Sequence, residues 1–335
     1  MSVHTTLQSQ QAFVIILAGW LVLSTVLRPV IAGDLDTTVP GRMVEIGTHK
    51  MHLNCRGYLS PTVIIDSGLG GFSLEWTNVQ NKLSRFSRIC TYDRSGYGWS
   101  EESPYPRTTR VIAGELYQLL MNAEVPGPYV MVGHSFGGYN IRYSASEYPN
   151  LVSGLVFVDA SHPEQFHRMP RPEPLETRIS DVNKVRQIKM ARPVLSRNYP
   201  AEYRFLAYRL MVSYKARRTQ LAELAHFNES ADQVSLNNRL PDVPVTVITR
   251  GARVWPHNRF GDESERVWQE LQGELVKLSH NSRQLIATRS GHSVHLDQPD
   301  MVEHAIIEML ESSRYINDLK LLYVQTNSHF DDKLN

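Results

Sequence analysis

The sequence has no excess charge of either sign. Its 335 residues include 35 lysines and arginines against 34 aspartates and glutamates, a formal net charge of +1. A protein that binds nucleic acid through bulk positive charge needs a basic excess, so this balance argues against that class. Hydrophobic residues make up 41% and charged residues 21% of the chain, which is the usage of a globular protein. At roughly 150 residues per domain, the length predicts about two domains, or one with an insertion.

Charge is nearly absent from the first 32 residues, where Arg28 is the only charged side chain. An apolar run extends from Ala12 to Leu27. As a helix it would rise roughly 24 Å, less than the roughly 30 Å hydrocarbon core of a bilayer. The basic residues that usually precede such a run in a signal peptide are missing. We nevertheless interpret residues 1–32 as a signal peptide or an N-terminal membrane anchor. The expected protein is membrane-anchored or exported and associates with a membrane through this segment.

Cysteine is scarce, because Cys55 and Cys90 are the only two in the chain. Two cysteines fit either a reducing or an oxidising compartment. In an exported protein such a pair would form a disulfide, so the predicted Cys55–Cys90 disulfide depends on the predicted export. The alternative is two buried thiols. Asn228 begins the single glycosylation sequon, which matters only in a host that glycosylates.

Internal repeats and low-complexity tracts are also absent. Instead, six short apolar, β-branched runs alternate with helical patterns, bounded by glycine, proline or polar turns. Such runs are typical of buried strands in a parallel sheet with helices between them. They are residues 62–66, 88–92, 129–132, 154–158, 243–249 and 284–288. Two further runs, 41–46 and 50–55, predict an antiparallel hairpin at the edge of the sheet. The predicted fold class is therefore α/β.

The connection between the fourth and fifth runs is too long for a single helix. Residues 160–240 are helical in pattern and rich in proline at their start. We therefore predict a helical cap over 160–240, inserted between core segments 39–159 and 241–314, with a polar tail over 315–335. The cap contains 14 basic and 8 acidic side chains, whereas the rest of the chain after residue 32 contains 20 basic and 26 acidic ones.

A nucleophile motif follows the third run directly. The sequence Gly133-His134-Ser135-Phe136-Gly137 stands between a predicted strand and a helix-like segment. A sharp strand-to-helix turn needs glycine where side chains would clash, and it holds the serine hydroxyl at the helix N-terminus. The motif alone is common by chance, but this context predicts that Ser135 is a nucleophile. The alternative is an ordinary glycine turn.

A serine hydroxyl needs a base to remove its proton. His292 follows the last predicted strand and precedes a new helix, which places it at the same edge of the sheet as Ser135. His295 is the second candidate, although a packing role suits it better. His134 is held in the turn too close to the nucleophile to serve.

The base needs a carboxylate to hold its tautomer and stabilise its cation. Asp159 follows the 154–158 strand at once, whereas no acid appears after the 243–249 strand until Asp262. We therefore assign the role to Asp159 and keep Asp262 as the alternative acid. The alternative role of Asp159 is a helix or turn cap.

A developing oxyanion needs two amide donors. One is expected from the backbone N–H of Phe136, directly after the nucleophile. The other is expected from Leu69, with Gly70 as a second possibility, in the glycine-rich loop of residues 67–71. A phosphate-binding loop is the rival interpretation of those glycines, but the Gly-Lys-Ser/Thr that would follow is missing.

These segments together resemble the α/β-hydrolase superfamily, in particular its cap-bearing esterase and lipase-like members with a serine nucleophile. The resemblance covers about residues 39–314 and rests on SGLGG, DRSGYGWS, GHSFGG, VDASHP and SGHSVHLDQPD. It implies an α/β-hydrolase fold, a mostly parallel sheet flanked by helices with an inserted helical cap. It also implies architectural roles for Asp93 and Ser100. The family's acid usually follows the strand matched by 243–249; Asp159 lies one strand earlier, as in some relatives. Ser67 stands where many relatives have histidine.

The predicted function is a serine hydrolase that cleaves carboxylic esters, with amides and lactones also open, through an acyl-enzyme intermediate. Ser135 would attack, His292 would move the proton and Asp159 would orient the histidine, without cofactor or metal. The expected partner is a small hydrophobic ester and no nucleic acid. An acyltransferase with the same residues is one alternative, and a non-catalytic ligand-binding protein of this fold is another.

Overall fold

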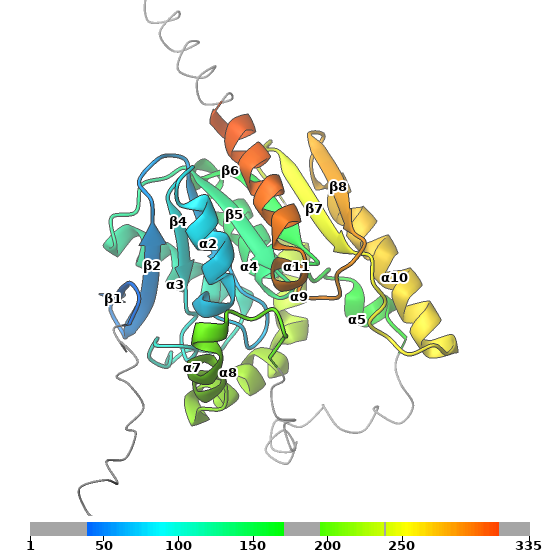
Figure 1. Ribbon diagram of the computed structural model, residues 1–335, viewed down its shortest axis with the longest axis horizontal. Helices are drawn as coiled ribbons and strands as arrows, with labels where there is room; N and C mark the ends of the chain where they lie inside the picture. Colours follow the sequence, from blue (N-terminus) through cyan, green and yellow to red (C-terminus); the bar gives the residue numbers. More distant parts are fainter. Residues whose placement is uncertain (1–38, 171–194, 238, 315–335) are drawn as a thin grey trace, which may run out of the picture. The chain divides into compact units, whose positions relative to one another are not determined.

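The computed structural model describes residues 39–170, 195–237 and 239–314. A compact unit that begins at Gly41 contains every element described below. At its centre lies an eight-stranded sheet in the order β1-β2-β4-β3-β5-β6-β7-β8 (Figure 1). The strands are β1 (Arg42–Glu45), β2 (Lys50–Arg56), β3 (Thr62–Asp66), β4 (Ile89–Tyr92), β5 (Tyr129–His134), β6 (Val152–Val158), β7 (Val245–Arg250) and β8 (Ser282–Ala287).

The sheet is mostly parallel. The β1–β2 and β2–β4 pairs are antiparallel, which gives the hairpin expected at the edge, and every other pair is parallel. The predicted α/β-hydrolase fold class is confirmed. β7 begins at Val245 and not at 243, because Pro244 has no N–H to donate to the ladder. β8 is a half-exposed edge strand, and its pairing with β7, not its hydrophobicity, fixes its ends.

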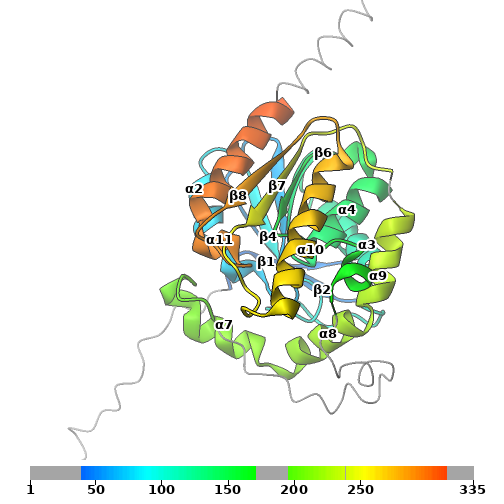
Figure 2. The same ribbon diagram turned by 90° about the vertical axis from the view of Figure 1, so that its right-hand side faces the viewer.

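Alternate side chains on each central strand pack into two separate cores, as strand geometry requires. On β3, Val63 and Ile65 enter one core with α2 (Thr77–Leu83) and the helix of residues 299–314. Ile64 enters the other core with α3 (Thr109–Asn122), α4 (Gly137–Glu147) and α10 (Arg259–Leu275). Figure 2 shows the sheet between these two helical layers. The three layers leave the carboxyl ends of the parallel strands at one edge, where the candidate site residues lie.

The remaining helical elements range from three residues in the shortest 3-10 turns to 12 residues in the longest helix. Between β6 and β7 the chain forms α5 (Gln165–Arg168), α7 (Arg204–Met211), α8 (Tyr214–Ala225) and α9 (Phe227–Leu236). Helices α7 and α8 lie at one end of the sheet (Figure 2), and α9 packs on α3 and α4. Elsewhere the chain forms η1 (Ser73–Trp76), η2 (Pro149–Leu151), η4 (Ala201–Tyr203), η5 (Val276–Leu278) and α11 (Val294–Asp297). Within the predicted cap, residues 171–194 lie outside the described residues.

The register of the antiparallel pair places Cys55 of β2 directly opposite Cys90 of β4. Their sulfur atoms are bonded, at 2.03 Å. The disulfide therefore joins the edge hairpin to the central part of the sheet.

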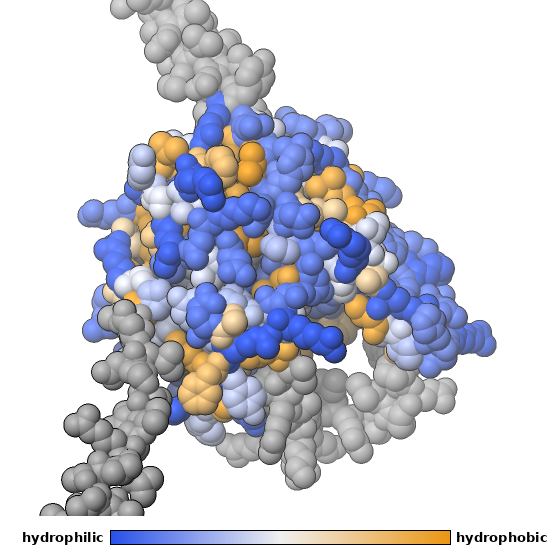
Figure 3. Space-filling model, in the orientation of Figure 1, coloured by the Kyte–Doolittle hydropathy of each residue, from blue (hydrophilic) through white to orange (hydrophobic). Residues whose placement is uncertain are grey.

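The predicted membrane or export segment finds no support in the structure. In the part of the chain that the structure describes, no helix combines the length and the apolar character needed to cross a bilayer. Residues 1–32, on which the prediction rested, lie outside the described residues, as does the tail 315–335. The apolar run itself is short, since it would rise roughly 24 Å against a core of roughly 30 Å. On the face drawn in Figure 3, hydrophobic residues gather only in small groups on a mostly hydrophilic surface.

Candidate active site

Ser135 occupies a sharp turn between β5 and α4. Its φ of +50° is a left-handed conformation that non-glycine residues rarely adopt. The turn is closed by backbone hydrogen bonds from Ser135 N–H to the Val158 carbonyl, 3.2 Å, and from Ser161 N–H to the Ser135 carbonyl, 2.9 Å. A Cβ on Gly137 would lie 2.3 Å from the Asp66 carbonyl oxygen, so only glycine fits there. This is the geometry that the sequence motif predicts for a nucleophile.

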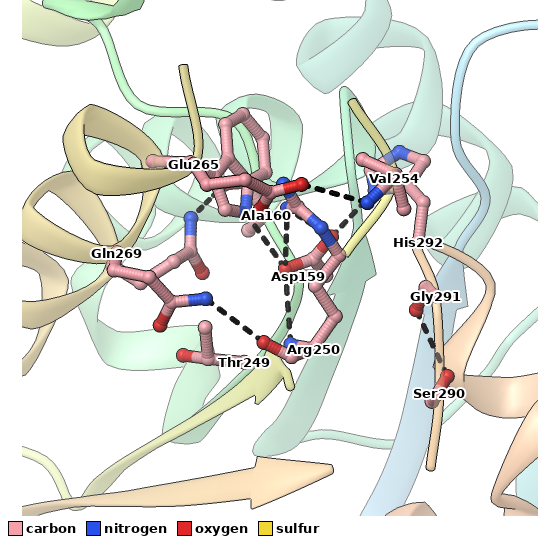
Figure 4. Close-up of polar contacts among 12 residues, drawn as sticks. Asp159, Ala160, Thr249, Arg250, Val254, Glu265, Gln269, Ser290, Gly291 and His292 are labelled. Carbon is pink, nitrogen blue, oxygen red and sulfur yellow. Dashed lines mark hydrogen bonds and ion pairs between the residues drawn. The ribbon is translucent and has the colours of Figure 1, made fainter. Parts of the chain in front are cut away.

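Asp159 lies at the end of the neighbouring strand β6 and is fully buried. Its φ of +41° is also left-handed. The carboxylate accepts hydrogen bonds from His292 Nδ1 at 2.6 Å, from Trp268 Nε1 at 2.8 Å and from Arg250 Nη1 at 3.1 Å. Figure 4 shows the Arg250 and His292 side chains reaching Asp159 from different strand ends. A carboxylate with this many charged and ring N–H partners is built to stay ionised.

Burial opposes ionisation of Asp159, but its partners outweigh that effect. The hydrogen bond from His292 and the nearby positive charge of Arg250 hold the pKa of Asp159 below its ordinary value, with help from the Trp268 N–H. The carboxylate is therefore negative across the neutral range, as an orienting acid must be.

His292 lies on the loop between β8 and α11, and 40% of its side chain is exposed. With Nδ1 bonded to Asp159, its Nε2 is the ring atom left to act on a substrate or a nucleophile. Within the described residues, no hydrogen bond joins His292 to the Ser135 hydroxyl. The two strand ends are connected instead through His134, whose Nε2 lies 2.9 Å from the His292 carbonyl oxygen. In ligand-free active sites the nucleophile–base bond is often long and tightens when substrate binds.

The other candidates have different partners. Asp262, the alternative acid, lies in the first turn of α10 with 65% of its side chain exposed, and it pairs with Arg253 at 2.7 Å. His295, the alternative base, is buried, and its ring stacks on Trp76 with centroids 4.2 Å apart. The structure thus brings Asp159, and not Asp262, to His292.

The glycine-rich loop after β3 approaches the nucleophile closely. A Cβ on Gly68 would lie 3.2 Å from the Ser135 Cβ. The candidate oxyanion donors are the backbone N–H of Phe136, directly after Ser135, and that of Leu69 or Gly70 in this loop. Both Leu69 and Phe136 pack in one apolar cluster.

Arg94 holds this loop and was not found from the sequence. Its guanidinium donates to the Ser67 carbonyl at 2.5 Å and the Gly68 carbonyl at 2.8 Å. It also forms buried ion pairs with Asp66 and with Glu223 of α8, each at 2.9 Å. The loop therefore depends on a helix of the inserted segment. The sequence feature that could have indicated Arg94 is its place in the DRSGYGWS stretch, directly after Asp93. The Asp93 side chain accepts hydrogen bonds from the backbone N–H groups of Ser73 and Trp99.

Arg250 is the second residue that sequence reasoning missed. It ends β7, the strand after which the family's acid usually comes, and its guanidinium contacts two indole rings, 4.5 Å from the centroid of Trp255 and 4.9 Å from that of Trp268. Besides Asp159 it pairs with Glu265 at 3.1 Å. Arg250 therefore occupies the end of β7, where the family usually has its acid. Its guanidinium pairs with Asp159, the acid at the end of β6. A basic residue in that place was the available signal.

Comparison with known proteins assigns the family. The model of the alpha/beta hydrolase family matches residues 63–305, and the chain belongs to this family. It is 28% identical over 320 residues to a protein named "Probable transporter efuK" from Hormonema carpetanum, covering 83% of this chain and 44% of that protein. The chain thus spans less than half of that relative's length. It is 25% identical over 262 residues to the uncharacterized protein YqjL of Bacillus subtilis, covering 78% of this chain and 87% of that protein.

Solved structures share the fold. A thermophilic esterase from Thermogutta terrifontis superposes with a TM-score of 0.62 at 20% identity, covering 82% of this chain and 99% of that one. The enol-lactonase from Burkholderia xenovorans LB400 superposes with a TM-score of 0.59 at 16% identity, covering 81% of this chain and all of that one. At these identities the likeness establishes the fold alone.

The Arg250–Asp159 ion pair predicts a pH-dependent stability defect. Arg250→Met leaves a buried carboxylate without its cation and should lower the free energy of unfolding by about 3 kcal/mol at pH 7. A lowered native pKa means that Asp159 stabilises the fold above its unfolded pKa of about 3.9 and stops doing so as the pH falls through the native value. The difference from wild type should therefore narrow below about pH 4 in urea titrations.

The matched control is Arg266→Met on α10, which removes an arginine paired only with exposed glutamates. That variant should unfold almost like the wild type. An Arg250→Met variant as stable as the control, or a defect independent of pH, would contradict the role given to the pair.

Proposed function

We propose that the protein is a serine hydrolase of carboxylic esters, with residues 160–240 as its cap. The observation that carries the proposal is the 2.6 Å bond between His292 Nδ1 and buried Asp159, beside a serine in a left-handed strand-to-helix turn. Family membership supports hydrolysis. The structural neighbours that act on esters and lactones support the bond type. A serine in place of an aspartate at the turn argues against epoxide opening.

In the proposed reaction, Ser135 Oγ forms a bond to the ester carbonyl carbon while His292 Nε2 takes the hydroxyl proton. The carbonyl oxygen becomes an oxyanion, which the amides of Leu69 and Phe136 stabilise. The carbon–oxygen bond to the leaving alcohol then breaks, and His292 returns the proton to that oxygen. Water repeats the sequence on the acyl-enzyme and releases the acid. Asp159 remains ionised throughout and stabilises the imidazolium.

An apolar substrate suits the side chains around the oxyanion loop. Phe136 contacts Phe227 of α9 with ring centroids 5.0 Å apart, and Phe227 contacts Phe166 of the same inserted segment at 5.0 Å. Phe166 is an exposed aromatic side chain. Phe136 and Phe227 are buried, so it is against Phe166 that a hydrophobic acyl or alcohol group would gain by leaving water.

The direct test of the proposal is hydrolysis of p-nitrophenyl esters of increasing acyl length. The wild type should release p-nitrophenol. Its kcat/KM should rise with acyl chain length, because a longer chain can contact the exposed ring of Phe166. Ser135→Ala should reduce kcat by about 10⁴-fold or more, since the covalent step is lost. If wild type and Ser135→Ala hydrolyse the esters at the same rate, the proposed function is wrong.

The assignment of the acid is tested by two matched variants. Asp159→Asn should lower kcat by about 10⁴-fold, because the neutral side chain no longer holds the imidazole in the right tautomer or stabilises its cation. Asp262→Asn removes an exposed carboxylate paired with Arg253 and should retain wild-type kcat. Steady-state kinetics with circular dichroism as a folding check decide the matter. Loss of activity in Asp262→Asn alone would reverse the assignment.

A further inference from the structure

Three side chains other than Ser135, His292 and Asp159 converge in one cluster. Glu75 lies in η1 after the glycine-rich loop, His134 ends β5 and His295 lies in α11. One ligand-type atom from each, an oxygen and two ring nitrogens, lie within 4.8 Å of one another. His295 Nε2 and Glu75 Oε1 are 3.8 Å apart, too far for a hydrogen bond. The three segments are far apart in the sequence, which is why the motifs did not reveal them.

The converging atoms are buried and unpartnered. His134 is 6% exposed and His295 is 2% exposed. Among the residues that the structure describes, His134 Nδ1, both ring nitrogens of His295 and Glu75 Oε1 have no hydrogen-bond partner. Buried polar atoms without a partner are costly and are rare in native proteins. Something of complementary chemistry has to satisfy them.

The tautomer of His134 identifies that chemistry. Its Nε2 lies 2.9 Å from the His292 carbonyl oxygen, which can only accept, so Nε2 carries the proton. In the neutral ring Nδ1 then carries a lone pair, and it lies within 4.8 Å of a carboxylate oxygen of Glu75. Histidines that bind metals typically donate their other ring N–H to a carbonyl in this way.

Two glycines make room for the cluster. A Cβ on Gly68 would lie 2.8 Å from His134 Nδ1, and a Cβ on Gly71 would lie 2.4 Å from Glu75 Oε1. Either side chain would displace the ligand atoms. On the other side, the ring of Trp76 stacks on His295 and fixes its plane.

We propose that Glu75, His134 and His295 form a binding site for a divalent transition metal of the zinc class. Two imidazole nitrogens and one carboxylate oxygen are a donor set that zinc uses in proteins. Bonds of roughly 2.1 Å hold tetrahedral ligands roughly 3.4 Å apart, so shifts of about an ångström would complete the site.

The metal would have a structural role. It would join the glycine-rich loop, the turn that contains Ser135 and the loop that contains His292, because one ligand comes from a segment adjoining each. The inference does not depend on ester hydrolysis, since the site is defined by ligand geometry and its readouts are metal content and stability.

The test uses the full chain without an affinity tag, treated with EDTA and dialysed. Zn²⁺ is then titrated by calorimetry, with Mg²⁺ as a control ion, and bound metal is measured by mass spectrometry of the elements. The wild type should bind one Zn²⁺ per chain, ignore Mg²⁺ and unfold at a higher temperature with zinc. Glu75→Gln and His295→Gln should each bind Zn²⁺ about tenfold more weakly or worse. The exposed His304→Gln should bind like the wild type.

Two outcomes overturn the proposal. A wild type that binds no stoichiometric Zn²⁺ would mean that water, not metal, satisfies the cluster. Equal affinity in wild type and Glu75→Gln would mean that the ions bind elsewhere, on other histidines of the chain. Glu75→Gln preserves the size of the side chain, so the comparison holds even if His295→Gln fails to fold.

Discussion

The buried carboxylate of Asp159 is the group on which the geometry of the candidate site depends. A charge with no exposure to water is tolerated only if protein groups replace the lost solvation. Here the replacements come from three places: a guanidinium at the end of β7, an indole N–H on α10 and an imidazole on the loop after β8. Satisfying one charge therefore orders three segments. The same contacts hold Nδ1 of His292 on Asp159, so that Nε2 is the ring nitrogen left for the nucleophile.

The strand ends bring the reacting groups together because all of the strands concerned are parallel. Ser135 follows β5, Asp159 follows β6 and His292 follows β8, so they share one edge of the sheet. Two of the three residues sit at positive φ, a strain that the sheet and the crossing hydrogen bonds must support. Opposite them, buried Arg94 fixes the glycine-rich loop to β3 and to α8. Buried ion pairs of Arg250 and Arg94 thus position the acid Asp159 and the glycine-rich loop, respectively.

Most of the fold could be predicted from the hydrophobic runs and turn residues of the sequence. The β3 run is recovered at 62–66, and the other runs differ from their strands by a few residues at the ends. Those ends depend on pairing: Pro244 delays the start of β7, and β8 is defined by its partner and not by burial. The membrane prediction over residues 1–32 finds no support, because no helix in the described part of the chain could cross a bilayer. Ser135 and the order of the triad residues follow from the motif and from strand ends.

Long-range charge partners could not be predicted in the same way. Arg250, Trp268 and Glu223 reach the site from elements whose relative placement depends on tertiary packing, which no local pattern encodes. The cluster of Glu75, His134 and His295 is hidden for the same reason. In each case the residue type is ordinary on its own. The role of each residue depends on a buried neighbour that is distant in the sequence.

The central claim is that Ser135 is an activated nucleophile, and labelling with a fluorophosphonate tests it most directly. The reagent forms a phosphorus–oxygen bond to an activated serine and releases fluoride, so it reports nucleophilicity without a known substrate. Intact mass and peptide mapping should show one adduct per chain on Ser135, and none in Ser135→Ala. No adduct on the folded wild type, or equal labelling of Ser135→Ala, would contradict the account.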